Sequence, residues 1–366
     1  MKVVRKTARV RSEKRRGVEI IDQLIKKLPS WASGRGEQGD ILLSTRIRLA
    51  RNLYGIPFPS TAGDEELQAV VEAVEKACQQ SRVFDGAVYL YLQQTDEISR
   101  KVLVERRLIS PMFAEAKHPG MVVIDTAENI SIMVNEEDHL RIQSIQPGLG
   151  LKEAWRVISR VDDELSEHLS YAFSEQFGYL TACPTNTGTG MRASILIHLP
   201  ALSILDEVEQ IIRELAPSEI AVRGFYGEGT EVIGNIFQIS NQLTLGRTET
   251  AIIDRLEVVA NKFIEMEQEA RERLLKKQRV DLEDRIYRSL GILRHARIMS
   301  SLELMNHLSM VRLGVDMGFI DGLTPEILNE LMIFTQPAHM QKLDRRLEDS
   351  HQRDVVRAEM IRQKIH

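Results

Sequence analysis

Three short apolar runs in the middle of the chain limit the folds that are open to it. The runs 121–125, 130–134 and 140–145 each have the length of a β-strand, and the residues between them are too few to form a helix. Strands joined this closely pair as antiparallel hairpins, because a parallel pair needs a crossover of a dozen or more residues. The stretch therefore predicts an antiparallel sheet rather than regular βαβ winding.

Other strand-like and helical segments alternate on both sides of these runs. Further strands are expected at 41–49, 87–92, 193–199, 219–225 and 235–240. Helices are expected at 17–31, 64–80, 95–107, 151–170 and 202–215. The pattern predicts an α+β fold in which helices flank an antiparallel sheet.

The composition changes after residue 247. A long helical run rich in Glu, Arg, Leu and Ala begins there, and shorter helical patterns follow to the end of the chain. We expect a catalytic domain over 17–247 and an all-helical domain over 248–366. Residues 1–16 are basic and are expected to form a disordered, solvated tail, with a weak contact to nucleic acid or a partner as the alternative.

Charge and cysteine content exclude several classes of protein. The 48 Lys and Arg residues against 53 Asp and Glu residues give a net charge of −5, so a basic site has to be local. The two cysteines, Cys78 and Cys183, do not have the spacing of a metal site and fit a reducing compartment. We find neither a signal-peptide pattern nor an apolar run that spans a bilayer, and we therefore expect a cytoplasmic protein without a structural metal.

The stretch LLSTRIRLARN (42–52) sets arginines among apolar residues. Side chains of a strand alternate between its faces, so Arg46 and Arg48 share one face with Ser44. Arg51 falls on the opposite face or beyond the strand, and we interpret it as structural. Two adjacent guanidinium groups suit phosphate oxygens, although surface salt bridges explain this stretch alone equally well.

Three other segments favour an anion site. The turn NEEDH (135–139) carries three acids, which are either a solvated tip or contain one carboxylate directed at a cationic substrate. CPTNTGTGMR (183–192) is either a plain loop or a loop whose backbone approaches an anion, without a Walker signature. VRGFYGEGTE (222–231) has the composition of a mobile substrate-closing loop.

Five arginines stand in or beside the predicted strands: Arg46, Arg48, Arg141, Arg192 and Arg223. If they converge, a nucleoside triphosphate is the anion dense enough to require them, and the nearby carboxylates indicate a second substrate that is cationic.

These motifs, in this order, resemble the guanidino (phosphagen) kinases. The segments STRIR, NEEDHLRI, CPTN with GTG and RAS, and RG with YGE carry the resemblance over roughly 40–260. VLVERRLISP, NIFQISNQLTLG, MVRLGVDMG, LNELMIFTQP and RDVVRA are most similar to the bacterial protein-arginine kinases in that family. The resemblance implies the catalytic fold of guanidino kinases and glutamine synthetase, and a helical dimerisation domain.

The resemblance also implies residue roles. It makes Glu137 the catalytic carboxylate, Glu228 its partner on the loop and Cys183 the active-site thiol. The implied ATP-binding residues are Ser44, Thr45, Arg46, Ile47, Arg48, Arg107, Arg141, Arg192, Ala193, Ser194, Ile195, Leu196, Arg223, Gly224, Phe225, Tyr226, Gly227 and Glu228. The implied phosphoarginine-binding residues are Arg353, Asp354, Val355, Val356, Arg357 and Ala358. Arg107 stands where the family has a histidine, and an arginine there can still contact a phosphate.

The implied reaction transfers the γ-phosphoryl group of Mg²⁺-ATP to arginine side chains of proteins, as a mark for degradation in a stress response. By resemblance, the partners are a zinc-finger activator, a Clp ATPase or protease and a transcriptional repressor, and the chain is a homodimer. The alternatives are a kinase of free guanidino compounds and a phosphoarginine-binding pseudokinase. Only about 40 residues precede STRIR, too few for the helical domain that encloses small substrates in the metabolic enzymes, which favours a protein substrate.

Overall fold

One antiparallel sheet forms the centre of the molecule. The computed structural model describes residues 21–215, 220–224 and 232–365. Within these ranges, eight strands follow the order β2-β3-β4-β5-β1-β8-β10-β9, and each neighbouring pair is antiparallel. They are β1 (Leu42–Arg51), β2 (Val88–Tyr91), β3 (Met121–Ile124), β4 (Ile130–Val134), β5 (Leu140–Pro147), β8 (Met191–His198), β9 (Ile220–Arg223) and β10 (Ile236–Asn241). The predicted α+β class is confirmed, and each predicted strand is present.

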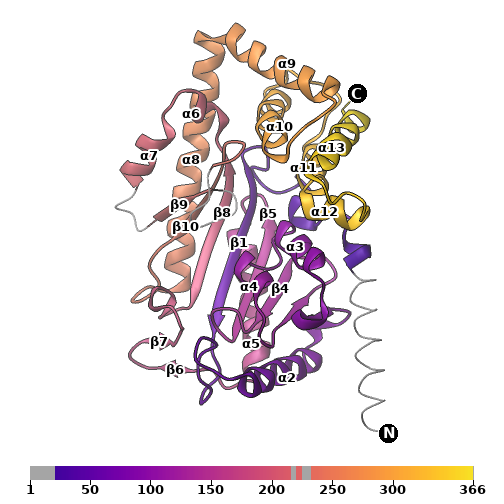
Figure 1. Cartoon of the computed structure of the whole chain (residues 1–366). Helices are drawn as coiled ribbons and strands as arrows, with labels where there is room; N and C mark the ends of the chain where they lie inside the picture. Colours follow the sequence, from indigo (N-terminus) through magenta and orange to yellow (C-terminus); the bar gives the residue numbers. More distant parts are fainter. Residues whose placement is uncertain (1–20, 216–219, 225–231, 366) are drawn as a thin grey trace.

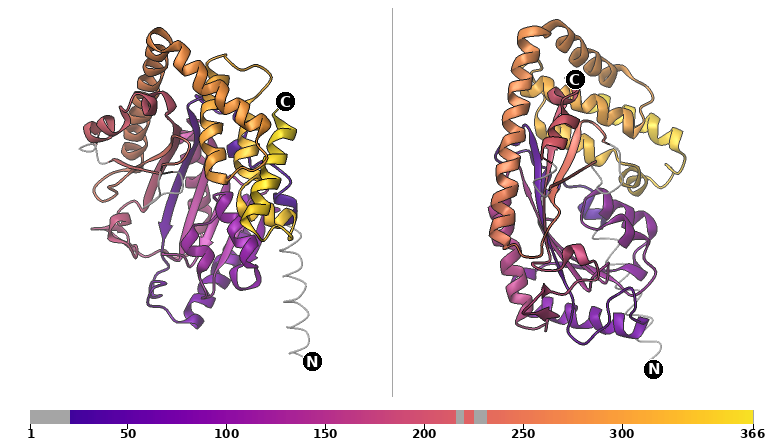
Figure 2. Two further views of the ribbon diagram at one scale, coloured as in Figure 1. Left: turned by 45° about the horizontal axis from the view of Figure 1, so that its top comes forward. Right: turned by 90° about the vertical axis from the view of Figure 1, so that its left-hand side faces the viewer.

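Long helices cover one face of this sheet. Figures 1 and 2 show α5 (Leu151–Ser166) and α8 (Glu249–Lys277) on this side, and their residues contact β1, β5, β8 and β10. Strand side chains such as Ile47, Leu49 and Ile195 join the same core as α2 (Asp64–Gln80). Full burial of one such side chain stabilises the fold by about 1.5–3 kcal/mol.

The opposite face is covered over only part of its width. Two helices, α3 (Glu97–Glu105) and α4 (Pro111–Glu115), pack there on β2, β3 and β4 and form a second core with residues such as Leu103, Phe113 and Val122. Beyond these helices, β5, β1, β8, β10 and β9 present polar side chains on the same face. This half of the face carries the candidate site.

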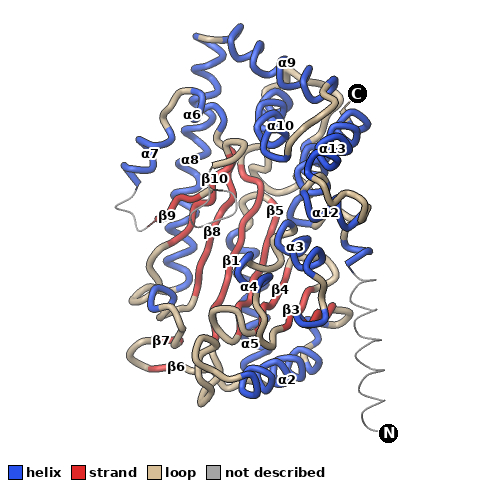
Figure 3. The backbone as a smooth tube through the Cα atoms, in the orientation of Figure 1, coloured by secondary structure: helices blue, strands red, loops and turns tan. Residues whose placement is uncertain are grey.

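The C-terminal part of the chain is helical. It comprises α9 (Arg279–His295), α10 (Ser301–Asp316), α11 (Pro325–Phe334), α12 (Pro337–Leu343) and α13 (Ser350–Lys364), and Figure 3 shows these helices gathered at one end of the sheet. Helix α12 contacts α3 at the edge of this helical group. The Glu105 carboxylate of α3 accepts hydrogen bonds from the backbone N–H groups of Ala338 (2.7 Å) and His339 (2.8 Å) at the start of α12.

Some predicted helices have other limits in the structure. The helix expected at 202–215 is two helices, α6 (Pro200–Ile204) and α7 (Val208–Leu215), because Asp206 between them has a positive φ of 57°. The helix expected at 17–31 ends at residue 24, and its first four residues and the tail 1–16 lie outside the described residues. Smaller elements complete the fold: β6 (Phe173–Ser174), β7 (Gly178–Tyr179), and the 3-10 helices Ser30–Ala32, Arg82–Phe84, Leu92–Gln94 and Pro184–Asn186. In the described part of the chain, every helix is too short or too polar to cross a bilayer.

Candidate active site

Six arginines line one pocket on the partly covered face of the sheet. The pocket has a volume of about 170 Å³, and its arginines are Arg46, Arg48, Arg107, Arg141, Arg192 and Arg223. Strand register explains this convergence, since Arg48 on β1 lies directly opposite Arg192 on β8. The structure therefore brings together the five arginines singled out in the sequence, with Arg107 as a sixth.

Burial makes this cluster costly without an anion. Desolvation lowers the pKa of Arg46 well below its usual value, and the charges of Arg107, Arg141 and Arg192 lower it further. The pKa of Arg48 falls for the same reasons, with Arg141 the largest charge effect. The Nε atoms of Arg46 and Arg48 are buried and find no hydrogen-bond acceptor among the described residues. A bound polyanion would supply both the charge and the acceptors, so the pocket is suited to a dense anion.

One neutral acceptor lies among these cations. Gln238 on β10 accepts a hydrogen bond from Arg46 through its Oε1 atom at 2.9 Å, and Arg107 approaches the same oxygen at 3.5 Å. Because the amide spaces two guanidinium groups without neutralising either, the pocket keeps its positive charge.

Arg51 lies on the other face of β1 and has a different environment. Its guanidinium forms a bidentate ion pair with Asp162 of α5, with a closest N–O distance of 2.7 Å. It also donates to the carbonyls of Ala50 and Thr189 and stacks over the ring of Tyr179 at 3.5 Å. Arg51 and Asp162 are buried, and their ion pair holds α5 to the sheet. Arg51 is not among the residues that line the pocket.

The acidic turn between β4 and β5 has three carboxylates with distinct environments. Glu136 is buried and accepts hydrogen bonds from Arg141 (2.5 Å) and the Ser110 hydroxyl (2.6 Å). Burial opposes ionisation of Glu136, but Arg141 and these hydrogen bonds hold its pKa below the usual value. Asp138 is buried as well, and its Oδ1 accepts from the Asn52 side chain (2.6 Å) and the Ala182 N–H (2.7 Å). Both carboxylates therefore organise the turn.

Glu137 is the third acid, and its environment differs from that of its neighbours. It is half-buried, and its carboxylate accepts no hydrogen bond from any described residue. Burial raises its pKa, and the charges of Asp138 and Glu136 raise it further. Arg141 and Arg192 of the pocket act on the same carboxylate electrostatically. Glu137 therefore stands at the margin of the arginine cluster as a carboxylate with raised proton affinity.

The loop that contains Cys183 adjoins this turn. The bond from the Ala182 N–H to Asp138 fixes the loop one residue before Cys183. The thiol is half-buried, and its sulfur lies 3.0 Å from the Thr185 hydroxyl. Cys78, in contrast, lies on the buried face of α2, and burial raises its pKa to about 12, so it is an inert core thiol.

Several predicted residues belong to the same strands but face away from the pocket. Thr45 donates its hydroxyl to the Gly148 carbonyl (2.7 Å), and Ile47 lies in the core on the covered face. Ala193 and Ile195 point into that core too, while Ser44, Ser194 and Leu196 share the arginine face without lining the pocket. Gly224 follows β9. The predicted residues Phe225, Tyr226, Gly227 and Glu228 lie outside the described residues.

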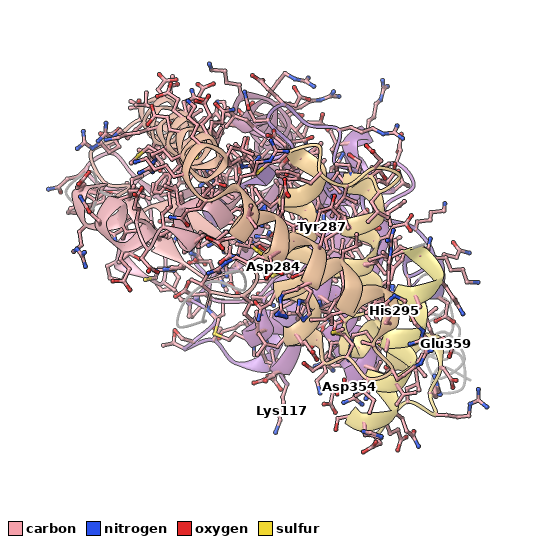
Figure 4. The ribbon with its side chains drawn as sticks, turned by 90° about the horizontal axis from the view of Figure 1, so that it is seen from above. Lys117, Asp284, Tyr287, His295, Asp354 and Glu359 are labelled. Atoms are coloured by element: carbon pink, nitrogen blue, oxygen red, sulfur yellow. The ribbon has the colours of Figure 1, made fainter. Side chains whose placement is uncertain are left out.

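The predicted phosphoarginine-binding motif lies on α13. Arg357 is buried and donates to the carbonyls of Thr335 (2.9 Å) and Met299 (2.8 Å) and to Asp354. Figure 4 shows Asp354 on α13, which packs against α9. Arg353 donates to the carbonyls of Leu347 and Glu348. Val355 is exposed, Val356 is half-buried and Ala358 is buried. The two arginines thus tie α13 to the preceding segments.

Sequence reasoning missed three polar residues of the site: Ser110, Gln143 and Gln238. Gln143 and Gln238 alternate with core residues on strands that were predicted, so the face that they share with Arg46 was a usable signal. The described residues bring no three His, Cys, Asp or Glu side chains together as a metal site. Kinase sites usually hold Mg²⁺ through one or two carboxylates together with substrate phosphate oxygens and water, so the bound phosphates would supply part of its ligands.

Two family models match the chain. The ATP:guanido phosphotransferase C-terminal catalytic domain matches residues 69–270, and the protein-arginine kinase McsB C-terminal domain matches residues 279–366. Among solved structures, the chain is similar to the duplicated taurocyamine kinase of Schistosoma mansoni with bound transition state analogue components (TM-score 0.59, 28% identity, 67% of this chain and 35% of that chain). It is also similar to lombricine kinase (TM-score 0.57, 25% identity, 66% of this chain and 71% of that chain).

Two relatives that match along nearly the whole chain have the same name. The protein-arginine kinase of Halothermothrix orenii is 45% identical over 350 residues, which are 95% of this chain and 100% of that protein. The protein-arginine kinase of Bacillus subtilis is 44% identical over 341 residues, with 93% and 94% covered. The chain therefore belongs to the protein-arginine kinases, within the family of ATP:guanido phosphotransferases.

Proposed function

We propose that this chain transfers the γ-phosphoryl group of ATP to arginine side chains of other proteins. The observation that carries the proposal is the pocket of six arginines beside the half-buried carboxylate of Glu137. The cluster is suited to a triphosphate, and a guanidinium substrate complements a carboxylate at its margin. Family membership supplies the reaction class.

The geometry suggests how the chain's own residues act. Arg46, Arg48 and the other pocket arginines bind and orient the phosphates and offset the charge that spreads over the transferring group. Mg²⁺, when bound with ATP, neutralises further phosphate charge. A guanidinium has a pKa above about 12, so its nitrogen needs a base before it becomes a nucleophile. Glu137 takes that proton as the N–P bond forms and the bond from phosphorus to the β,γ-bridging oxygen breaks.

Alignment of the two substrates also contributes to the rate. Holding a guanidinium nitrogen in line with the γ-phosphorus is worth up to roughly 7–11 kcal/mol when the geometry is ideal. Glu136 supports this alignment, because it is bonded to Arg141 in the pocket and its Oε2 accepts the backbone N–H of Glu137 at 3.2 Å. Cys183 on the adjacent loop would polarise the substrate guanidinium, and Glu228 would be the second carboxylate, after Glu137, that binds this guanidinium.

The remaining features of the proposal come from the family. We infer a homodimer built through the helical domain 248–366, and catalysis by the domain 17–247. Residues 353–358 would bind phosphoarginine, and the chain would be under allosteric control. A zinc-finger activator, a Clp ATPase or protease and a transcriptional repressor would be partners in a cytoplasmic stress response that marks proteins for degradation.

The test is incubation of the purified chain with Mg²⁺-ATP and an unfolded protein, followed by mass spectrometry at non-acidic pH, because P–N bonds hydrolyse in acid. We expect phosphoarginine in the protein substrate and little labelling of free arginine. Glu137→Gln should lower the rate by about 10²–10⁴-fold while ADP binding is retained. Efficient labelling of free arginine would instead identify a kinase of small guanidino compounds, and unchanged function of Glu137→Gln would favour the pseudokinase.

A further inference from the structure

Arg107 occupies a backbone position that normally requires glycine. Helix α3 ends with two bonds, from the Arg107 N–H to the Val104 carbonyl (2.8 Å) and from the Leu108 N–H to the Leu103 carbonyl (2.9 Å). These are the two bonds of a Schellman motif, in which the residue that Arg107 supplies adopts a left-handed conformation. Its φ is 63°, a region that is unfavourable for residues with a Cβ atom. The role of the Arg107 side chain explains why an arginine occupies this strained position.

That side chain reaches the arginine pocket. The Arg107 guanidinium lines the pocket, lies 5.7 Å from the ring centroid of Trp31 and has the largest charge effect on the pKa of Arg46. A glycine would end α3 without strain but would place no cation there. The strained turn is therefore the means by which α3 presents a guanidinium to the pocket.

The sheet below holds this turn in place through two polar side chains. Gln143 of β5 donates from Nε2 to the Arg107 carbonyl (2.8 Å), to the Ser131 hydroxyl oxygen (2.7 Å) and, at 3.3 Å, to the Leu108 carbonyl. Ser131 of β4 donates its hydroxyl to the Leu108 carbonyl (2.8 Å). Both residues are buried. The two successive carbonyls of the turn, those of Arg107 and Leu108, thus accept hydrogen bonds from side chains of the sheet.

The position of Gln143 relates the turn to the rest of the pocket. In the strand register Gln143 lies directly opposite Arg48 on β1 and opposite Ser131 on β4. The same sheet face thus carries Arg48 and the amide that fixes Arg107. A carboxylate could not replace this amide when ionised, because it has no N–H to donate.

We propose that Gln143 is a positioning residue for nucleotide binding, which sets the place of the Arg107 guanidinium by holding the strained turn that carries it. The inference rests on the proposed function, in which the pocket receives the phosphates of ATP. Gln143 acts through the backbone of Arg107, and Ser131 supports the same turn through its hydrogen bond to the Leu108 carbonyl.

The decisive variant is Gln143→Met, which keeps the length and volume of the side chain and removes the N–H donors. We expect the Kd for ADP and the KM for ATP to rise about fivefold to tenfold, while kcat with saturating ATP changes less than twofold. Gln146→Met is the matched control, because Gln146 stands on the same strand but faces Thr45 outside the pocket. It should leave both constants unchanged.

A double-mutant cycle separates positioning from a general structural effect. Arg107→Gly relieves the positive φ, so it should fold at least as stably as the wild type, and it should weaken ADP binding about 10-fold to 100-fold. In that background Gln143→Met should add less than twofold, because the group that it positions is absent. Additive losses, or unchanged ADP binding in Gln143→Met, would overturn the inference.

Direct measurement of ADP binding by calorimetry keeps this test distinct from that of the proposed function. If the chain binds ADP but phosphorylates no protein arginine, the proposed function fails while the effect of Gln143 is still measured. If Gln143→Met lowers the melting temperature strongly, the milder Ser131→Ala must raise the Kd for ADP in the wild type and not in Arg107→Gly. Equal effects in the two backgrounds would contradict the proposal.

Discussion

Two arginines of one strand, Arg48 and Arg51, should respond in opposite ways to the same substitution. Arg51→Met leaves Asp162 buried without its bidentate partner and frees the carbonyls of Ala50 and Thr189. Breaking a buried ion pair by removal of one partner costs about 3–5 kcal/mol. For a domain of about 200 residues, each kcal/mol lowers the melting temperature by about 2–4 °C, so a decrease of about 6–20 °C follows.

Arg48→Met should instead leave the melting temperature of the nucleotide-free protein unchanged or raise it. The substitution removes one charge from a partly buried cluster in which Arg141, Arg46 and Arg192 already lower the pKa of Arg48. With ADP bound, the variant loses charge-assisted hydrogen bonds worth about 1.5–3 kcal/mol, so the Kd should rise roughly 10-fold to 100-fold.

The assays are differential scanning fluorimetry without nucleotide and calorimetric titration with ADP at a temperature where both variants are folded. Arg51→Met should bind ADP like the wild type. The double variant Arg51→Met with Asp162→Leu should recover most of the lost stability, because it removes the unpaired charge. If Arg51→Met weakens ADP binding tenfold at an unchanged melting temperature, or if Arg48→Met destabilises the protein as much as Arg51→Met, the assignment of the two faces is wrong.

Three further predictions follow from groups outside the arginine pocket. Asp138→Asn keeps the side-chain oxygen that accepts both hydrogen bonds but removes a charge that raises the pKa of Glu137. The acid limb of the pH–rate profile should therefore move to lower pH. An acid limb at the wild-type pH would exclude Glu137 as the base. Burial raises the pKa of Glu105 to about 7 from 4.5, so its stabilising contribution is complete below pH 4.5 and is lost as the pH rises through 7. Glu105→Gln should therefore flatten the decline in unfolding free energy between pH 4.5 and 8 by about 3 kcal/mol, as measured with urea. Arg357→Met should destabilise the C-terminal helices by about 2–4 kcal/mol and raise their hydrogen exchange, whereas Val355→Ala on the exposed face of α13 should not.

The sheet was predictable because its signal is local. Alternation with a period of two is visible in each strand, and it separated Arg46 and Arg48 from Arg51 before any partner was known. The hairpins at 121–145 have short connections that leave few pairings open. The break at Asp206 inside the helix expected at 202–215 was less predictable, because positive φ is uncommon in residues other than glycine even though aspartate is enriched among them.

The contacts of the site were predictable only in part. Convergence of arginines follows from strand register, but the partner of Arg51 lies on a helix 111 positions along the chain, and alternation does not identify it. The amides of Gln143 and Gln238 look like ordinary strand residues until neighbouring strands are aligned. Arg107 was recognised from the resemblance alone, while the strained turn that directs it into the pocket depends on tertiary hydrogen bonds.

The arrangement of charge in the pocket is suited to a dense anion. The neighbouring charges lower the pKa of the partly buried Arg46 and Arg48, so the nucleotide-free pocket is a source of instability that the covered face of the sheet has to offset. A monoanion would relieve little of this repulsion, whereas a triphosphate can contact several arginines at once. The ion pair of Glu136 with Arg141 then connects the pocket to the turn that presents Glu137. In the proposed function, phosphate binding and placement of Glu137 as the base would therefore depend on the same side chains, which is the coupling that phosphoryl transfer to a guanidinium requires.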